Sequence, residues 1–172
     1  MKRFNLLLVV IFCALPLLCQ SKSSLISEWE LSGQSKFRFA WWDIYTAELF
    51  TPNGDYNPEQ PVALKLTYHR DFKGEKIVDR TITEIRRQKK LAAEQLENWK
   101  VQLNSIFPDI EEHDALTGVK SHDGTTYFLL NDVHIGSIND PQFSHYFFNI
   151  WLGEKTSEPE LREDLIGEKK TD

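Results

Sequence analysis

The chain has 172 residues, of which 41% are hydrophobic and 12% aromatic, enough to fill the core of one domain and too few residues for a second. With 26 acidic and 20 basic residues its formal net charge is −6, a sign that repels nucleic acid and anionic lipid headgroups. We therefore expect a single domain and no nucleic-acid partner.

The first 21 residues have the pattern of a signal peptide. Lys2 and Arg3 precede an unbroken apolar run, Leu6 to Leu18, that is too short to span a bilayer. We expect cleavage near Gln20 or Ser21, which would leave about residues 22–172 as a mature domain in the periplasm or outside the cell, with no transmembrane segment. The alternative is an uncleaved N-terminal anchor.

Both cysteines, Cys13 and Cys19, lie in this leader, so the mature chain would keep no thiol for disulfides, metal ligation or covalent catalysis. Attachment of a lipid to Cys19 is disfavoured because Leu18 is large where a lipoprotein signal has a small residue. Loss of Lys2 and Arg3 would take the formal net charge from −6 to −8. The mature domain would have to be stable by packing alone.

The first half of the mature chain carries strand patterns. The clearest is 62–70, in which every second residue from Val62 to Tyr68 is apolar or aromatic, as in a half-buried antiparallel strand. The intervening segment 51–61 is rich in Pro, Asn and Gly and is expected to be a loop. Further strands are expected at 26–31, 36–42 and 44–50.

Two helices should follow. Thr81 and Glu84 match a capping box, which indicates a helix start close to Thr81, within a few residues. A second helix is expected from Ala92 to Pro108, where proline stops it. Its apolar side chains, the Trp included, recur at three- and four-residue spacing and should face the core: Leu96, Trp99, Leu103 and Ile106.

The second half of the chain predicts strands at 116–121, 125–130 and 133–138, joined by turns of the hairpin type. Asp140 and Pro141 then suit the cap and first turn of an aromatic helix that ends at Gly153. One face of this helix carries Phe143, Phe147, Ile150 and Trp151.

A last helix is expected to start at Ser157, with Leu161 and Leu165 packed one turn apart. Strands, two helices, strands and two more helices make an α+β order. This order indicates a mostly antiparallel sheet with helices on one face.

The sequence contains no nucleophile elbow, phosphate-binding loop, dinucleotide motif or His-Glu-x-x-His pattern, so we expect no cofactor. No metal site is expected either, because the five histidines have no paired helical spacing and 111–114 reads as an acidic turn. Large aromatic and cationic side chains remain on the predicted sheet, among them Tyr45, Tyr68, Arg38 and Arg70.

An arginine at the end of an alternating strand can clamp a carboxylate by two hydrogen bonds, which a nearby tyrosine hydroxyl can share. Arg70 has this position, with Tyr68 two residues before it. The alternative is an edge arginine whose stem packs while its charged head stays in water.

Four stretches, in this order and spacing, resemble the bacterial chalcone isomerase-like family: DIYTAELF, ALKLTYHRDFKGE, WKVQLNSIFPDIEEHD and TYFLLNDVHIGSINDPQFSHYFFNIWLGEKTSEPELREDLIG. The resemblance extends from about Ser27 to Gly167. It implies an open-faced β-sandwich, in which helices cover a large antiparallel sheet and leave a ligand cleft between the layers. The aromatic helix 140–152 should then be buried against the sheet.

The same resemblance argues against chalcone cyclisation. Plant chalcone isomerases use a Thr, where this chain has Tyr45, and an Arg, where it has 33–35 without any cation, although Lys36 and Arg38 are close. Without that cation the phenolate loses its main electrostatic stabilisation.

Non-catalytic relatives of the plant enzyme bind fatty acids in the cleft through an Arg and a Tyr. By this resemblance Tyr45, Tyr68, Arg70 and Arg38 are the candidate ligand contacts, and the function expected is binding of a fatty acid or similar amphipathic molecule. One alternative is an isomerase or lyase for another unsaturated carbonyl compound, with Tyr45 as acid or base. Another is a scaffold protein with no ligand.

Overall fold

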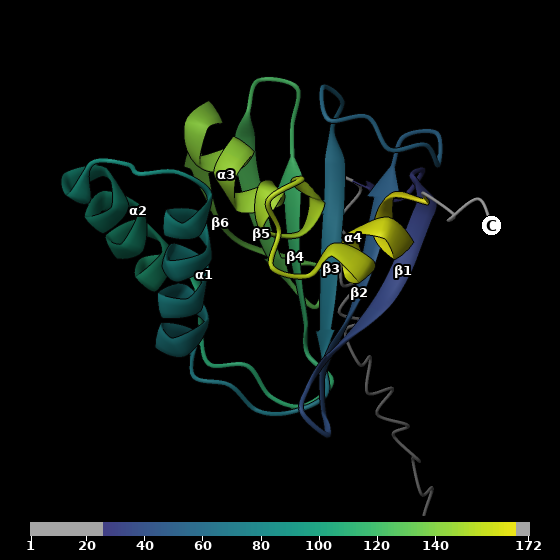
Figure 1. Ribbon diagram of the computed structural model, residues 1–172, viewed down its shortest axis with the longest axis horizontal. Coiled ribbons are helices and arrows are strands. Elements are labelled where there is room, and N and C mark those ends of the chain that lie inside the picture. The colour runs from purple at the N-terminus through teal and green to yellow at the C-terminus, as the bar shows by residue number, and fades with distance from the viewer. Residues whose placement is uncertain (1–25, 168–172) are drawn as a thin grey trace, which may run out of the picture.

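A computed structural model describes residues 26–167 as one antiparallel sheet with helices on one face (Figure 1). The predicted signal peptide and both cysteines lie outside the described residues. Six strands follow one another across the sheet in chain order: β1 Glu30–Phe39, β2 Trp42–Thr51, β3 Val62–Tyr68, β4 Ala115–Lys120, β5 Thr125–Leu130 and β6 Val133–Asn139. The described helices are α1 Gly74–Gln88, α2 Ala93–Ile106, α3 Pro141–Leu152 and α4 Pro159–Ile166.

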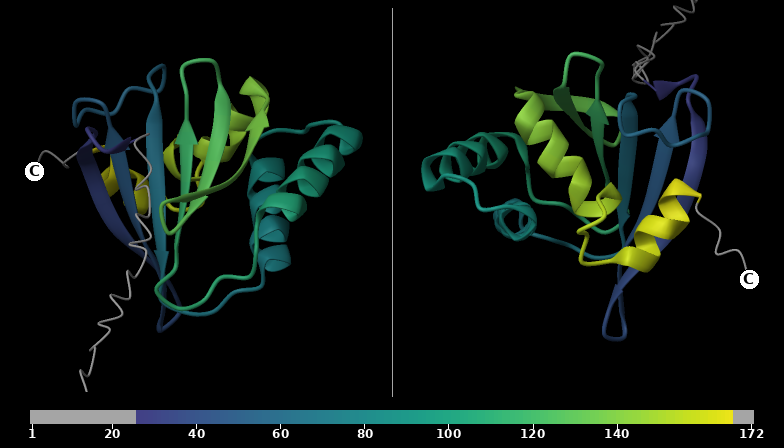
Figure 2. Two further views of the ribbon diagram at one scale, coloured as in Figure 1. Left: turned by 180° about the vertical axis from the view of Figure 1, so that it is seen from behind. Right: turned by 45° about the horizontal axis from the view of Figure 1, so that its top comes forward.

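Helices α3 and α4 lie directly against the sheet, α3 beside β5 and α4 across β1 and β2. Helix α1 packs on both α3 and α2, and α2 also contacts β6 at the edge of the sheet (Figures 1 and 2). No helix of the described chain covers the opposite face of the sheet, as the rear view in Figure 2 shows. The α+β, open-faced arrangement expected from the sequence is therefore confirmed. Among residues 26–167, none of the helices is long and apolar enough to cross a membrane.

The N-terminal strand differs from expectation, because the segments 26–31 and 36–42 were predicted as two strands. Instead β1 pairs with β2 along its whole length. The register with β2 shifts near Gly33 and Phe37, which interrupts the alternation of side chains between the two faces of the sheet. For this reason a two-residue period did not reveal one continuous strand in the sequence. The turn into β2 lies at Ala40, which has a φ of 53°.

The capping-box prediction for the first helix is wrong. Helix α1 begins at Gly74, and Thr81 lies inside it, where its hydroxyl donates to the carbonyl of Ile77 at 2.9 Å. The carboxylate of Asp109 instead accepts from the backbone N–H of Gly74 at 3.1 Å. Because this acceptor is 35 residues away in the chain, local sequence could not reveal it.

Helix α3 confirms the predicted cap and buried face. One Asp140 oxygen accepts from the backbone N–H of Gln142 and of Phe143, and the other accepts from Nε1 of Trp99 at 2.8 Å. A single carboxylate therefore caps α3 and fixes it to α2. The rings of Phe143 and Phe147 are buried and stack with centroids 5.5 Å apart.

Helix α4 starts with Glu158 at its N-cap, one residue after the predicted Ser157. Leu161 and Leu165 are buried, as expected. The helix crosses β1 at Gly33, where a Cβ would overlap the carbonyl oxygen of Asp164. This close approach explains a glycine in the middle of a strand.

Replacing Asp140 by Ala should lower the free energy of unfolding by about 2–4 kcal/mol, because a helix cap contributes about 1 and an indole N–H buried without an acceptor costs about 1–3. Asp140→Asn should cost less, since its amide oxygen can still cap the helix. Urea denaturation followed by tryptophan fluorescence measures both values. Equal losses in the two variants would contradict the double role of this carboxylate.

Candidate ligand-binding cavity

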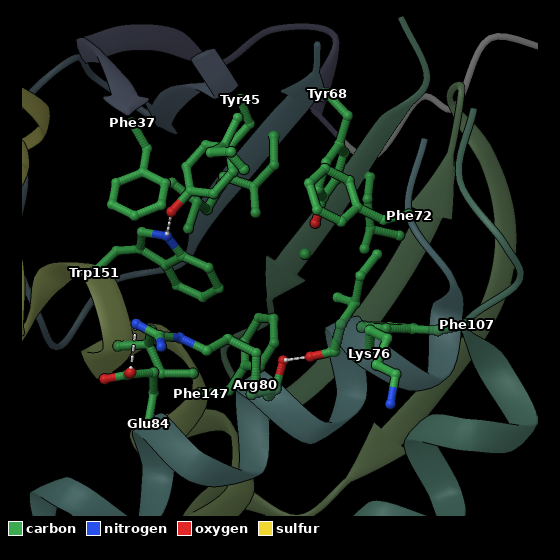
Figure 3. A pocket seen from close by; sticks show the side chains of 18 of the residues that line it. Phe37, Tyr45, Tyr68, Phe72, Lys76, Arg80, Glu84, Phe107, Phe147 and Trp151 are labelled. Atoms are coloured by element: carbon green, nitrogen blue, oxygen red, sulfur yellow. Dashed lines mark hydrogen bonds and ion pairs between the residues drawn. The ribbon is translucent and has the colours of Figure 1, made fainter. Parts of the chain in front are cut away.

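A cavity of about 240 Å³ lies between the helix-covered face of the sheet and helices α1 and α3 (Figure 3). Its volume is close to the lower end of the range for small-molecule sites. Gly118 of β4 leaves room for the ring of Phe147, since a Cβ there would lie 3.0 Å from Cε1 of that ring. Apolar side chains form most of the wall: Leu64, Leu66, Ile77, Leu116, Phe128 and Phe147.

Four aromatic rings form a row along one side of the cavity. Phe37 stacks on Tyr45 with ring centroids 5.1 Å apart, and Tyr45 meets Tyr68 edge-on at 5.9 Å. Phe72 continues the row at 5.4 Å from Tyr68. The first three are cross-strand partners in the sheet, so the register of β1, β2 and β3 places them together. The structure thus brings together two of the predicted site residues.

The hydroxyl oxygen of Tyr45 accepts a hydrogen bond from Nε1 of Trp151 at 3.0 Å. This bond joins β2 to the last turn of α3. Desolvation by burial raises the pKa of Tyr45 to about 12, although the Trp151 hydrogen bond acts in the opposite direction. The Tyr45 hydroxyl is therefore a neutral hydrogen-bonding group near pH 7. Its proton has no acceptor within residues 26–167 and remains available to a ligand.

The side chain of Tyr68 is only 4% exposed, and in Figure 3 its hydroxyl points into the cavity. Within the described chain this hydroxyl has no hydrogen-bond partner. Desolvation raises the pKa of Tyr68, and the neighbouring Tyr45 raises it further. A buried hydroxyl without a hydrogen-bond partner destabilises the folded state. A ligand or water atom that hydrogen-bonds to it removes this cost, which favours binding.

Charged side chains lie at the rim of the cavity. Lys76 and Arg80 are exposed residues one turn apart on α1. Arg80 pairs with the buried carboxylate of Glu84 at 2.8 Å, and Arg87 pairs with the same carboxylate at 3.1 Å. Lys76 has no ion pair within residues 26–167. Because Glu84 keeps Arg87 as a partner, Arg80 can turn toward a ligand without leaving that carboxylate unpaired.

Arg70 and Arg38, the other two predicted contacts, lie outside this cavity. The Arg70 guanidinium lies over the ring of Trp42, 3.9 Å from its centroid. Nε of Arg38 donates to Asp43 at 2.7 Å, and hydrogen bonds from Lys36 and Arg38 lower the pKa of Asp43. Strand β3 ends at Tyr68 and the chain bends at the next two residues, so the alternation that pointed Arg70 inward does not reach it.

The rim cations Lys76 and Arg80 were not among the predicted site residues. Their four-residue spacing on one side of a helix was visible in the sequence. What was not visible is that this side of α1 borders a cavity, because the start of α1 was placed too late. Within residues 26–167 no three His, Cys, Asp or Glu side chains are grouped so that they could hold a metal ion.

An antiparallel sheet covered by helices on one face, with a mostly apolar cavity and a few polar groups between the layers, defines an α+β architecture with an internal cavity. A family model described as chalcone isomerase-like matches residues 27–167. The chain therefore belongs to the chalcone isomerase-like family, as the sequence resemblance indicated.

The chain is also similar to individual proteins, one by its sequence and one by its structure. An uncharacterized protein of Haemophilus influenzae is 26% identical over 172 residues, covering 99% of this chain and 80% of that protein. The crystal structure of the Arabidopsis thaliana fatty-acid binding protein AtFAP1 matches with a TM-score of 0.65 and 13% identity, covering 85% of this chain and 90% of that chain. At this identity the second match establishes the shared fold.

The free energy of unfolding should fall as the pH rises from about 10 to about 12. An unfolded tyrosine has a pKa near 10, whereas burial raises the pKa of Tyr45 to about 12, so over this interval the folded state binds the proton more tightly. Its contribution of about 2–3 kcal/mol is fully present below pH 10 and lost above 12. Urea unfolding across this interval should give a shallower fall for Tyr45→Phe; an identical slope would contradict the burial of this hydroxyl.

Proposed function

We propose that this chain is a non-catalytic binding protein for a fatty acid or a similar amphipathic carboxylate, exported to the periplasm or the cell exterior. The observation that carries the proposal is the cavity itself, which has apolar walls, two tyrosine hydroxyls and a few charged side chains, the cations Lys76 and Arg80 and the carboxylates Glu84 and Glu158. This distribution matches a molecule with a hydrocarbon body and one charged end. The fatty-acid binding of AtFAP1, which shares the fold, supports it.

The polar end of the ligand belongs at Tyr45 and Arg80. A carboxylate buried alone in an apolar wall is costly, so it should lie where a cation and a hydroxyl proton converge. After burial and the Trp151 hydrogen bond, Glu158 raises and Arg80 lowers the pKa of Tyr45, so a charge of each sign lies near this hydroxyl, whose proton is unused. Trp151 already donates to the same oxygen, which orients that proton away from the indole. The hydrocarbon then lies along the apolar wall formed by β3, β4 and β5.

Binding is better supported than turnover. A general acid or base works best with a pKa near the working pH, and Tyr45 has a pKa of about 12. Glu84, the buried carboxylate at the rim, is held by two arginines. The isomerase alternative would need Tyr45 to exchange its proton in spite of this burial.

The proposed location rests on the leader. The basic start and apolar run of residues 1–18 are the pattern of export signals, and a mature chain without cysteine is compatible with an oxidising compartment. Expressing the protein with its own leader, purifying it from the periplasm and measuring its mass would test both export and cleavage. Mass spectrometry of organic extracts from the same sample would identify any lipid that copurifies.

Arg80→Ala and Tyr45→Phe should each weaken binding of dodecanoic acid by roughly threefold to tenfold, as expected for a partly solvated charge contact or one hydrogen bond. Displacement of a fluorescent fatty acid measures the affinity. Arg86→Ala is the matched control, because Arg86 lies on the same helix outside the cavity. Arg70→Ala tests the sequence-based assignment directly: unchanged affinity for Arg80→Ala together with weakened binding for Arg70→Ala would overturn the proposed polar end.

Tyr68→Phe should instead tighten binding of dodecanoic acid, by roughly fivefold or more. A plain hydrocarbon segment displaces water from the Tyr68 hydroxyl and leaves it unpaired, which costs about 1 kcal/mol or more. Tyr127→Phe, on the opposite face of the sheet, should leave the affinity unchanged. Weaker binding by Tyr68→Phe would show that this hydroxyl donates a hydrogen bond to the ligand carboxylate. The polar end of the ligand would then lie closer to Tyr68 than proposed.

A further inference from the structure

The β1–β2 hairpin ends in three large aromatic side chains that the fold leaves exposed. Phe39 is 70% exposed, Trp41 82% and Trp42 47%. Six large hydrophobic side chains are exposed in the described part of the chain, and these three fall within four consecutive positions while the other three are dispersed. Single exposed apolar residues need no explanation, but a cluster at one point indicates an interaction site.

The turn itself gives no reason for this composition. Ala40 has a φ of 53°, a region in which Gly or Asn is less strained, and the neighbouring tip positions hold no Gly, Asn, Asp or Pro. Phe39 and Trp42 are cross-strand partners, and Trp42 carries the Arg70 guanidinium, so these two rings have some contact within the hairpin. None of the three belongs to the hydrophobic core, and most of the surface of Phe39 and Trp41 faces solvent.

The projecting shape of the tip favours a deformable partner, such as a lipid layer, over a protein surface. Figure 1 shows the hairpin extending beyond the other described elements at the lower end of the sheet. A projecting finger of rings would need a matching pocket in a protein partner, whereas the interface of a lipid bilayer accepts it without one. Indole rings, apolar with one N–H donor, are the side chains enriched at that interface.

The charges around the tip are locally balanced. Lys36 and Arg38 both pair with Asp43, at 2.9 and 2.7 Å. Arg70 is stacked on Trp42 and lines the same surface hollow as Asp71 and Glu112, so three cations stand beside three carboxylates. There is thus no free basic patch for an anionic surface, and the acidic balance of the whole chain disfavours one. A zwitterionic headgroup layer fits both facts.

We propose that the hairpin tip, Phe39 to Trp42, inserts into the headgroup region of a zwitterionic phospholipid bilayer. The tip is continuous with the cavity, because Phe37 and Ile44 line it from the same hairpin, two residues before and after the tip. Docking through the tip brings this side of the cavity toward the layer in which an amphipathic carboxylate is dissolved. Exchange of ligand at that surface rests on the proposed function, whereas the docking does not.

The test uses protein expressed with its own leader, and vesicles of phosphatidylcholine with brominated acyl chains. Bromine quenches only nearby indoles, and residues 1–28 contain no tryptophan, so the leader cannot give this signal. The double variant Phe39→Ser/Trp41→Ser should lose quenching and roughly tenfold or more in vesicle partition, since each buried ring contributes at least the 1.4 kcal/mol that a factor of ten requires. The matched control is Val101→Ser/Val133→Ser, which removes two exposed apolar side chains elsewhere and should bind as wild type.

Binding should persist in high salt, because apolar insertion is not screened. Absence of quenching in the wild type, or equal quenching in the tip variant, would overturn the proposal. Binding that requires phosphatidylglycerol and disappears with salt would overturn it as well, in favour of electrostatic adsorption.

Without vesicles, the tip variant should bind dodecanoic acid with wild-type affinity. If the wild type does not bind dodecanoic acid, the proposed function is rejected, whereas the conclusion about docking of the tip is unaffected.

Discussion

Burial of the α3 rings against the sheet is the interaction on which the rest of the structure depends. Phe143 and Phe147 meet Phe128 of β5 edge-on, with centroids 6.3 and 5.4 Å away. With no thiol in the described chain, area removed from water must supply the stability, and aromatic rings supply most per residue. The Asp140 carboxylate fixes the helix in place by joining its first turn to α2.

The cavity is a consequence of how far this packing reaches. At one end of α3 the rings fill the space above β4 and β5, while at the other end Trp151 reaches across to the Tyr45 hydroxyl. The row of rings from Phe37 to Phe72 and the wall of α1 then stand apart from one another. What remains between them is apolar except for two hydroxyls and a charged rim, a combination that selects for ligands with one polar end.

The β1–β2 hairpin connects the interior with the outside. Its inward residues line the cavity, and its tip carries rings that the core does not use. The same short element can therefore hold a ligand and contact the phase from which the ligand comes. Arg70 and Arg38, which looked like ligand contacts in the sequence, instead belong to the surroundings of this tip, because β3 ends before Arg70 and Asp43 holds Arg38.

Sequence alone determined the order of elements from β2 onward, the antiparallel sheet, the buried α3 face, and Tyr45 and Tyr68 as polar residues of the inner face. These follow from local periodicity, turn chemistry and the family resemblance, all of which act over a few residues or along the whole chain. Only the tertiary structure decided where α1 begins, because its cap is Asp109, and which cations border the cavity, because Lys76 and Arg80 reach it only through the packing of α1. Contacts between distant segments set both, and no local pattern encodes such contacts.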